Sequence, residues 1–130
     1  MKTIPRLYRI LNEKTGEHFT IFALSPEHAL KIVPVPFPST PDIPVKVEEV
    51  LATEASTGIQ YPVYRLKDIP YNTYFKSVNI CGMKATSTVL IKDKNSYNRS
   101  TKKYDCTVFR DISLSRSYLP SHYVIIDFTF

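Results

Sequence analysis

The second half of the chain alternates short runs of β-branched and aromatic residues with polar turns, and this pattern limits the possible folds most. Residues 92–110 indicate one long basic hairpin, and the run Tyr-Val-Ile-Ile-Asp-Phe-Thr-Phe at 123–130 indicates a closing strand. In that run Val124, Ile126 and Phe128 occupy alternate positions, which is typical of a strand with one buried face. This half therefore predicts a sheet, to which the first half is a smaller attachment.

Residue parity predicts which side chains of the basic hairpin face outward. In its first arm Val89 and Ile91 share one face, and residues 95–102 form the polar turn. In its second arm Val108 faces the core, so Phe109, the next residue, is expected to point outward. An outward ring is available for stacking or for contact with another protein.

Five strand candidates lie within residues 66–130 and are joined by short connections. An antiparallel sheet of this size can close into a small barrel, which removes the exposed edges that an open sheet leaves. We therefore expect an α+β protein that is mostly β. The predicted domains are an N-terminal ββα(β) module over residues 1–62 and an antiparallel barrel over residues 63–130.

The first half carries its own local signals. Residues 6–11 and 18–23 are strand-like runs on either side of a turn in which Gly16 can adopt positive φ, so they predict a β-hairpin. Ser25 as N-cap, followed by Pro, predicts the start of a short helix. Residues 34–44 hold five Pro and predict an extended connector, which is either a stiff spacer or a ligand for an SH3 or WW domain. The run after this connector predicts a strand that returns to the hairpin.

Positive charge is concentrated in the second half. The formal net charge is +5, of which residues 1–63 contribute −1 (six Lys and Arg against seven Asp and Glu) and residues 64–130 contribute +6 (eleven against five). A basic half attached to a near-neutral half is typical of a protein with a polyanionic partner. The alternative is that the lysines keep an exposed β-surface soluble and its edges unpaired.

The sequence holds no arrangement typical of catalysis or metal binding. His18, His28 and His122 share no ligand spacing with each other or with the two cysteines, so we expect surface or edge histidines and reduced thiols. The three Gly are isolated, so no phosphate-cradling loop is predicted. Asp111 is expected to organise a turn through its side chain. These observations predict a protein that is not an enzyme and has no metal and no cofactor.

Cations interleaved with aromatic rings are the strongest candidate for a functional site. Nucleic-acid grooves on small barrels combine cations that neutralise phosphates with flat side chains on which bases stack. The other interpretation is that the rings pair across strands and the cations only flank them. The predicted nucleic-acid-binding residues are Lys92, Lys94, Tyr97, Arg99, Lys102, Lys103, Phe109 and Arg110.

Four stretches of the second half carry a resemblance to a known group of proteins. They are Leu66-x-Asp-Ile-Pro-x-x-Thr-x-Phe75, Tyr97-Asn-Arg-Ser-Thr-Lys-Lys-Tyr-Asp-Cys106, Phe109-Arg-Asp-Ile112 and Asp127-Phe-Thr-Phe130. Together they resemble uncharacterised small SH3-like β-barrel proteins carried by phages and mobile elements of Bacteroidota. The resemblance covers residues 66–130. It implies an SH3-like barrel and a mobile-element origin, without a known activity.

These observations predict a non-enzymatic protein that binds single-stranded or structured nucleic acid. Two alternatives stay open: a phage protein that binds a protein partner, such as a host-defence component or a virion part, and a protein that sequesters a small nucleotide in a basic pocket. The first residues lack the apolar run of a signal peptide, and no apolar segment approaches the roughly 20 residues needed to cross a bilayer. We therefore expect no membrane partner and a cytoplasmic location, in the host cytoplasm if the protein is phage-encoded. Homo-oligomers are compatible with the sequence.

Overall fold

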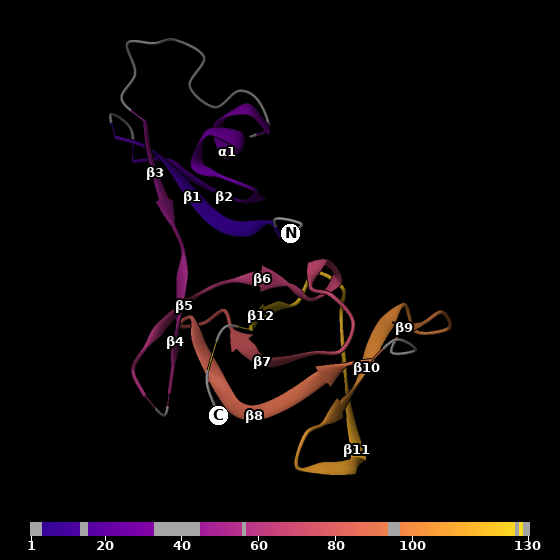
Figure 1. Ribbon diagram of the computed structural model, residues 1–130. Coiled ribbons are helices and arrows are strands. Elements are labelled where there is room, and N and C mark those ends of the chain that lie inside the picture. The colour runs from indigo at the N-terminus through magenta and orange to yellow at the C-terminus, as the bar shows by residue number, and fades with distance from the viewer. Residues whose placement is uncertain are drawn as a thin grey trace. The chain divides into compact units, whose positions relative to one another are not determined.

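The chain is mostly β, with one α-helix among the described residues, as expected for an α+β protein that is mostly β. It divides into two compact units, Met1–Val50 and Leu51–Phe130, called here unit 1 and unit 2. The Pro-rich run predicted as a connector lies outside the described residues, and none of the described helices is long and apolar enough to span a membrane. The computed structural model (Figure 1) describes residues 4–13, 16–32, 45–55, 57–93, 97–126 and 128.

Unit 1 is a three-stranded antiparallel sheet with one helix. The strand order is β2-β1-β3, and the elements are β1 (Arg6–Asn12), β2 (His18–Ala23), α1 (Pro26–Ile32) and β3 (Val45–Glu49). Gly16 lies in the β1–β2 turn at φ +80°, a conformation that glycine adopts without strain. The Ser25 hydroxyl accepts a hydrogen bond from the His28 backbone N–H at 3.1 Å, so it caps the helix as predicted. The buried core consists of Tyr8, Ile10, Ala23 and Ala29.

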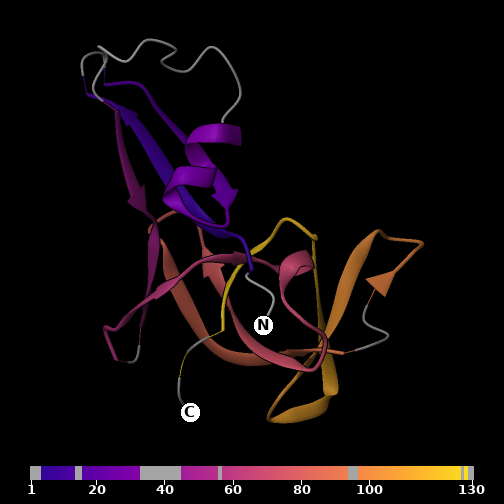
Figure 2. The same cartoon turned by 45° about the horizontal axis from the view of Figure 1, so that its top comes forward.

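Unit 2 is one sheet whose strands are mostly antiparallel. The order is β11-β10-β8-β7-β12-β6; in addition, β9 pairs with β10, and β4 pairs with β5 and, in parallel, with β8. Figure 1 and Figure 2 show β8 as a strongly curved strand. The elements are β4 (Leu51–Glu54), β5 (Gln60–Pro62), β6 (Tyr64–Arg65), the 3-10 helix η1 (Leu66–Asp68), β7 (Thr73–Asn79), β8 (Lys84–Lys92), β9 (Tyr97–Asn98), β10 (Lys103–Val108), β11 (Asp111–Tyr118) and β12 (Tyr123–Ile125).

The division between the units falls after Val50, whereas the sequence predicts it at 62/63. The reason is a long-range strand pairing: β4 runs parallel to β8, with Thr53 opposite Lys84, and β5 pairs with β4. Gly58, which suggested a linker, instead has φ +75° in the turn between β4 and β5. Both strands therefore belong to unit 2.

The closed barrel predicted for the second half is not found among the described strands. At one end of the sheet order, β6 has only two residues and pairs with β12; at the other end, β11 pairs with β10. No pairing between described strands joins β6 to β11, so the sheet path stays open. A very short edge strand offers little backbone for further pairing, which is one way in which natural sheets end. The closing strand is also shorter than predicted, since β12 ends at Ile125.

The core of unit 2 draws on each of its long inner strands. Phe75 of β7, Leu90 of β8 and Cys106 of β10 are all fully buried. On β8 the buried face carries Leu90 together with a charged residue, Lys92, whereas Val89 and Ile91 share the other, partly buried face. This assignment of faces decides which cations of the hairpin remain exposed.

His122 is a structural residue rather than the surface or edge histidine that the sequence predicts. Its Nε2 lies 2.6 Å from the hydroxyl oxygen of Ser77, which is buried, and its ring centre lies 4.6 Å from that of Tyr118. Its carbonyl oxygen accepts a hydrogen bond from the Leu66 N–H at 2.9 Å. Burial lowers the pKa of His122 below its usual value.

The lowered pKa of His122 predicts a loss of stability in mild acid. Below about pH 6.5 the unfolded chain binds a proton at this residue before the folded chain does, so stability falls as the pH drops from 6.5 toward the folded pKa. In His122→Gln, which can still hydrogen-bond to Ser77 but does not titrate, this part of the pH dependence should disappear. Thermal unfolding of both proteins between pH 7.5 and 5.5 measures it, and parallel profiles would contradict the prediction.

Candidate nucleic-acid interface

The predicted binding residues separate into a buried one and two exposed groups. Lys92 is only 3% exposed, and Lys94 lies outside the described residues. The exposed groups lie at opposite ends of β10. One group, called the ribbon tip, is Tyr97, Arg99, Lys102 and Lys103; the other, in the β10–β11 turn, is Phe109 and Arg110.

Lys92 supports the fold and is not an exposed cation, which corrects its predicted role. Its Nζ donates hydrogen bonds to the carbonyl oxygens of Ile69 at 2.7 Å and Lys67 at 3.3 Å. The same Nζ lies 4.9 Å from the ring centre of Tyr71 and 4.8 Å from that of Tyr104, where the ring faces stabilise a positive charge. Burial lowers the pKa of Lys92 below its usual value. The ammonium group thus joins the end of β8 to the segment around η1.

The ribbon tip is shaped by a tight turn that Asn98 organises. The Asn98 side-chain oxygen accepts hydrogen bonds from the backbone N–H groups of Ser100 at 2.9 Å and Thr101 at 3.3 Å. Its carbonyl oxygen accepts one from the Lys102 N–H at 2.8 Å, and Lys102 has φ +58°. Such Asx turns fix the backbone without using the neighbouring charged side chains.

The side chains of the ribbon tip are open to solvent. Arg99 and Lys103 are exposed, and Tyr97 is 41% exposed. The Tyr97 ring meets the Tyr104 ring edge to face, with 5.1 Å between the ring centres. This contact holds one edge of Tyr97 and leaves part of the ring open, as a stacking platform requires.

The β10–β11 turn presents a second aromatic ring. Phe109 is 42% exposed, in agreement with its predicted outward position. Its ring packs edge to face against Tyr74, itself 37% exposed, with 5.2 Å between ring centres. The Phe109 N–H donates to the Val89 carbonyl oxygen at 2.8 Å, which fixes the turn to β8. Arg110 follows and is exposed.

The exposed cations of the two units differ in how they are paired. In unit 1, Glu48 accepts both Arg9 at 2.6 Å and Lys46 at 2.8 Å, and Glu49 accepts Arg6 at 3.1 Å. In unit 2, several exposed cations form no ion pair within 4.0 Å among the described residues. They are Arg99, Lys102, Lys103, Arg110 and Arg116.

Nearby carboxylates of unit 2 are occupied by neutral donors. Asp105 accepts hydrogen bonds from the Ser117 hydroxyl and the Asn98 amide, which lower its pKa. Asp111 accepts the hydroxyl and the backbone N–H of Ser113, which lower its pKa in the same way and confirm that it organises a turn. These carboxylates therefore do not neutralise the cations beside them.

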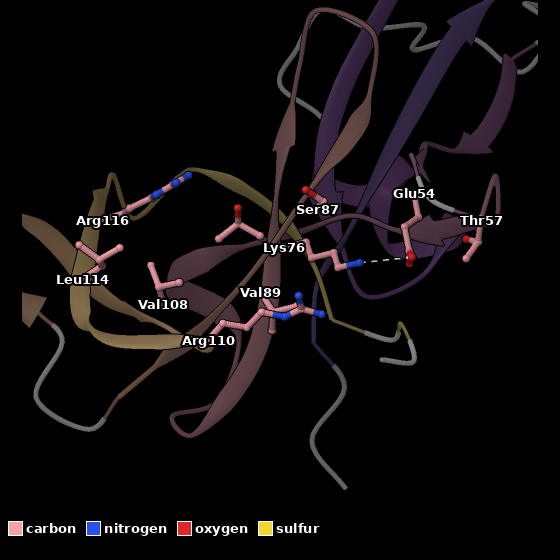
Figure 3. Close-up of a pocket in the computed structure, with 10 residues that line it drawn as sticks. Glu54, Thr57, Lys76, Ser87, Val89, Val108, Arg110, Leu114 and Arg116 are labelled. Atoms are coloured by element: carbon pink, nitrogen blue, oxygen red, sulfur yellow. Dashed lines mark ion pairs between the residues drawn. The ribbon is translucent and has the colours of Figure 1, made fainter.

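A cleft of about 540 Å³ lies beside the β10–β11 turn (Figure 3). The hairpin β10–β11 lines one side, the β4–β5 region lines the opposite side, and β7 and β8 lie between them. The residues that line it are Glu54, Thr57, Lys76, Ser87, Thr88, Val89, Val108, Arg110, Leu114 and Arg116.

Sequence reasoning missed most of this cleft, Arg116 above all. The register between β10 and β11 shifts after Thr107, which pairs with Ser115, so that the next residue, Val108, pairs with Asp111. This bulge decides which side chains of β11 reach the cleft. Bulges of this kind leave no periodic signal, and only the alternation of charged and apolar residues on β11 could have suggested Arg116.

The described residues offer no metal site and no reactive thiol in the interior. No group of three or more His, Cys, Asp or Glu in this part of the chain is placed to hold a metal ion. Cys81 is exposed and Cys106 is buried, and both are free thiols. Burial raises the pKa of Cys106 to about 12, so this thiol stays protonated near neutral pH.

A scan against protein-family models, a search of curated proteins and a search of solved structures found no match to this chain. What the site can bind must therefore follow from its own residues and geometry.

The role assigned to Lys92 predicts a loss of stability on substitution. Lys92→Met keeps the length of the side chain but leaves the carbonyl oxygens of Ile69 and Lys67 without this donor, which should cost about 1–3 kcal/mol. Lys84→Met, at the exposed start of the same strand, is the matched control and should change stability by less than about 0.5 kcal/mol. Urea unfolding measures both, and equal effects would refute the assignment.

Proposed function

We propose that this protein binds nucleic acid, in single-stranded form, through unit 2 and without catalysing a reaction. The observation that carries the proposal is the pairing contrast: ribbon-tip cations have no ion-pair partner among the described residues, whereas Arg6, Arg9 and Lys46 of unit 1 do. A cation without a carboxylate partner can neutralise a phosphate and release its counterion. The exposed rings beside these cations would stack on bases.

The spacing of the two exposed groups supports a short strand as the ligand. β10 separates the ribbon tip from the β10–β11 turn by six residues, or about 17 Å between its ends. Tyr97 lies at one end and Phe109 at the other. A strand running between them would cover a few nucleotides, which is within the range of roughly 4–16 for small nucleic-acid-binding barrels.

The SH3-like architecture and the mobile-element origin implied by the resemblance belong to this proposal. Their support is the resemblance itself and the antiparallel pairing of β7, β8, β10, β11 and β12, strands of the number that small barrels use. A phage-borne protein of this kind would meet its nucleic acid in the host cytoplasm. An experimental structure with β6 and β11 joined, directly or through the residues beyond β12, would support the barrel.

A protein partner is a second candidate, favoured by the exposed apolar side chains of β11. Ile112 is 86% exposed and Leu114 is 54% exposed, and β11 is the outer strand of its sheet order. An exposed strand edge with apolar side chains can accept a strand from another chain, including a second copy of this one. Such binding would survive removal of the ribbon-tip charge, which separates it from binding of nucleic acid.

Neutralising the ribbon tip is predicted to weaken nucleic-acid binding and its salt dependence together. In Arg99→Gln/Lys103→Gln, two phosphate contacts are lost, so the slope of log K against log salt should become shallower by about 1.4 for a single strand. Fluorescence anisotropy with a labelled oligonucleotide at several salt concentrations measures this slope.

The matched control is Lys31→Gln/Lys46→Gln in unit 1, which removes the same net charge and leaves Glu48 paired with Arg9. Its slope should equal that of the unaltered protein. Equal slopes for both double variants, or no binding of any oligonucleotide at low salt, would overturn the proposal.

The stacking role of Tyr97 predicts a separate, salt-independent effect. Tyr97→Ala removes a ring that should contribute about 1–3 kcal/mol of stacking, so affinity should fall roughly 5- to 150-fold with an unchanged salt slope. Tyr97→Phe keeps the ring and should bind within about twofold of the unaltered protein. If Phe and Ala variants bind equally well, the ring does not stack on a base.

A further inference from the structure

The charges that line the cleft do not cancel, and the excess is carried by two arginines. Glu54 and Lys76 pair with each other at 3.2 Å, and both are buried. The Lys76 Nζ also lies 4.7 Å from the ring centre of Phe128, which holds it in place. Arg110 and Arg116 form no ion pair within 4.0 Å in the described part of the chain. The cleft therefore carries a net charge of +2.

Two guanidinium groups beside one cleft select for a particular anion. Guanidinium groups bind phosphate oxygens through paired hydrogen bonds, and a phosphate monoester carries about −1.5 to −2 charges near pH 7. A carboxylate or an internal phosphodiester carries only one negative charge. The charge of Arg110 and Arg116 is thus matched best by a phosphate monoester, since Glu54 is already neutralised by Lys76.

The rest of the lining indicates that the phosphate is attached to a larger group. Ser87 and Thr88 offer hydroxyl groups, and Val89, Val108 and Leu114 offer an apolar surface. In Figure 3, Val108 and Leu114 lie on the same side of the cleft as the two arginines. A volume of about 540 Å³ is within the usual range for small-molecule sites, roughly 300–1,000 Å³. Inorganic phosphate would leave the apolar surface in contact with water, whereas a sugar and base would cover it.

We infer that this cleft binds the phosphate monoester of a nucleotide, held by Arg110 and Arg116, with the sugar and base against Val108 and Leu114. Two sources share this chemistry: a free 5′-mononucleotide and the phosphorylated end of a nucleic-acid strand. The first source is independent of the proposed function, and the second rests on it.

Calorimetric titration of the full chain with ligands that differ in one group tests the inference. The ligands are the four ribonucleoside 5′-monophosphates, the corresponding nucleosides, inorganic phosphate, and one eight-residue oligonucleotide prepared with a 5′-phosphate or a 5′-hydroxyl. At least one monophosphate, or the 5′-phosphorylated oligonucleotide, should bind about tenfold or more tightly than its counterpart without the phosphate. Inorganic phosphate should bind more weakly than that ligand.

Variants then place the binding in the cleft. Arg110→Gln and Arg116→Gln should each weaken binding of the phosphate-bearing ligand by about tenfold or more. Both residues are exposed, so both variants should keep the thermal stability of the unaltered protein. Arg99→Gln/Lys103→Gln at the ribbon tip is the control, because it removes two positive charges outside the cleft; it should leave binding of the monophosphate within about twofold.

The outcomes separate this inference from the proposed function. Binding of a monophosphate, with no binding of the 5′-hydroxyl oligonucleotide, supports the cleft site and refutes the nucleic-acid proposal. A preference for the 5′-phosphorylated oligonucleotide alone supports a strand end as the source. The inference is overturned if the phosphate makes no difference to any ligand, if inorganic phosphate binds as tightly as the nucleotides, or if the ribbon-tip control loses as much affinity as the arginine variants.

Discussion

The buried ammonium group of Lys92 is the interaction on which the geometry of unit 2 depends. It lies between the rings of Tyr71 and Tyr104 and donates to two carbonyl oxygens of the segment around η1. A buried charge is costly unless it is fully hydrogen-bonded, so the loop and the rings must close around it for the strand to be stable there. This requirement fixes the end of β8, and with it the direction in which the chain leaves toward the ribbon tip.

Local signals in the sequence predict unit 1 well, because each of its elements depends on near neighbours. Gly16 and Ser25 occupy the turn and the helix cap expected of them, and Phe109 is exposed as its parity predicts. Lys92 could not be placed in this way, since its main acceptor, the Ile69 carbonyl, lies 23 residues away. The unit boundary was missed for a similar reason, because a parallel pairing between β4 and β8 is a long-range contact.

The candidate site was predicted only in part, and the bulge between β10 and β11 explains the difference. Residue parity holds as long as register holds, and the register shift after Thr107 ends its use for β11. Arg110 was identified as a cation of the hairpin, but its association with Arg116 and Lys76 requires the folded sheet. Composition showed where the positive charge lies along the chain. Only the structure shows which cations have carboxylate partners among the described residues.

The ion pair between Glu54 and Lys76 has a consequence for how unit 2 assembles. Glu54 belongs to the first strand of the unit, and Lys76 also contacts Phe128, near the end of the described chain. Contacts between residues so distant in sequence form late, because the entropy of closing a long loop must be overcome first. The cleft should therefore be among the last features to appear during folding, and a partly folded chain would expose its arginines without offering the pocket between them.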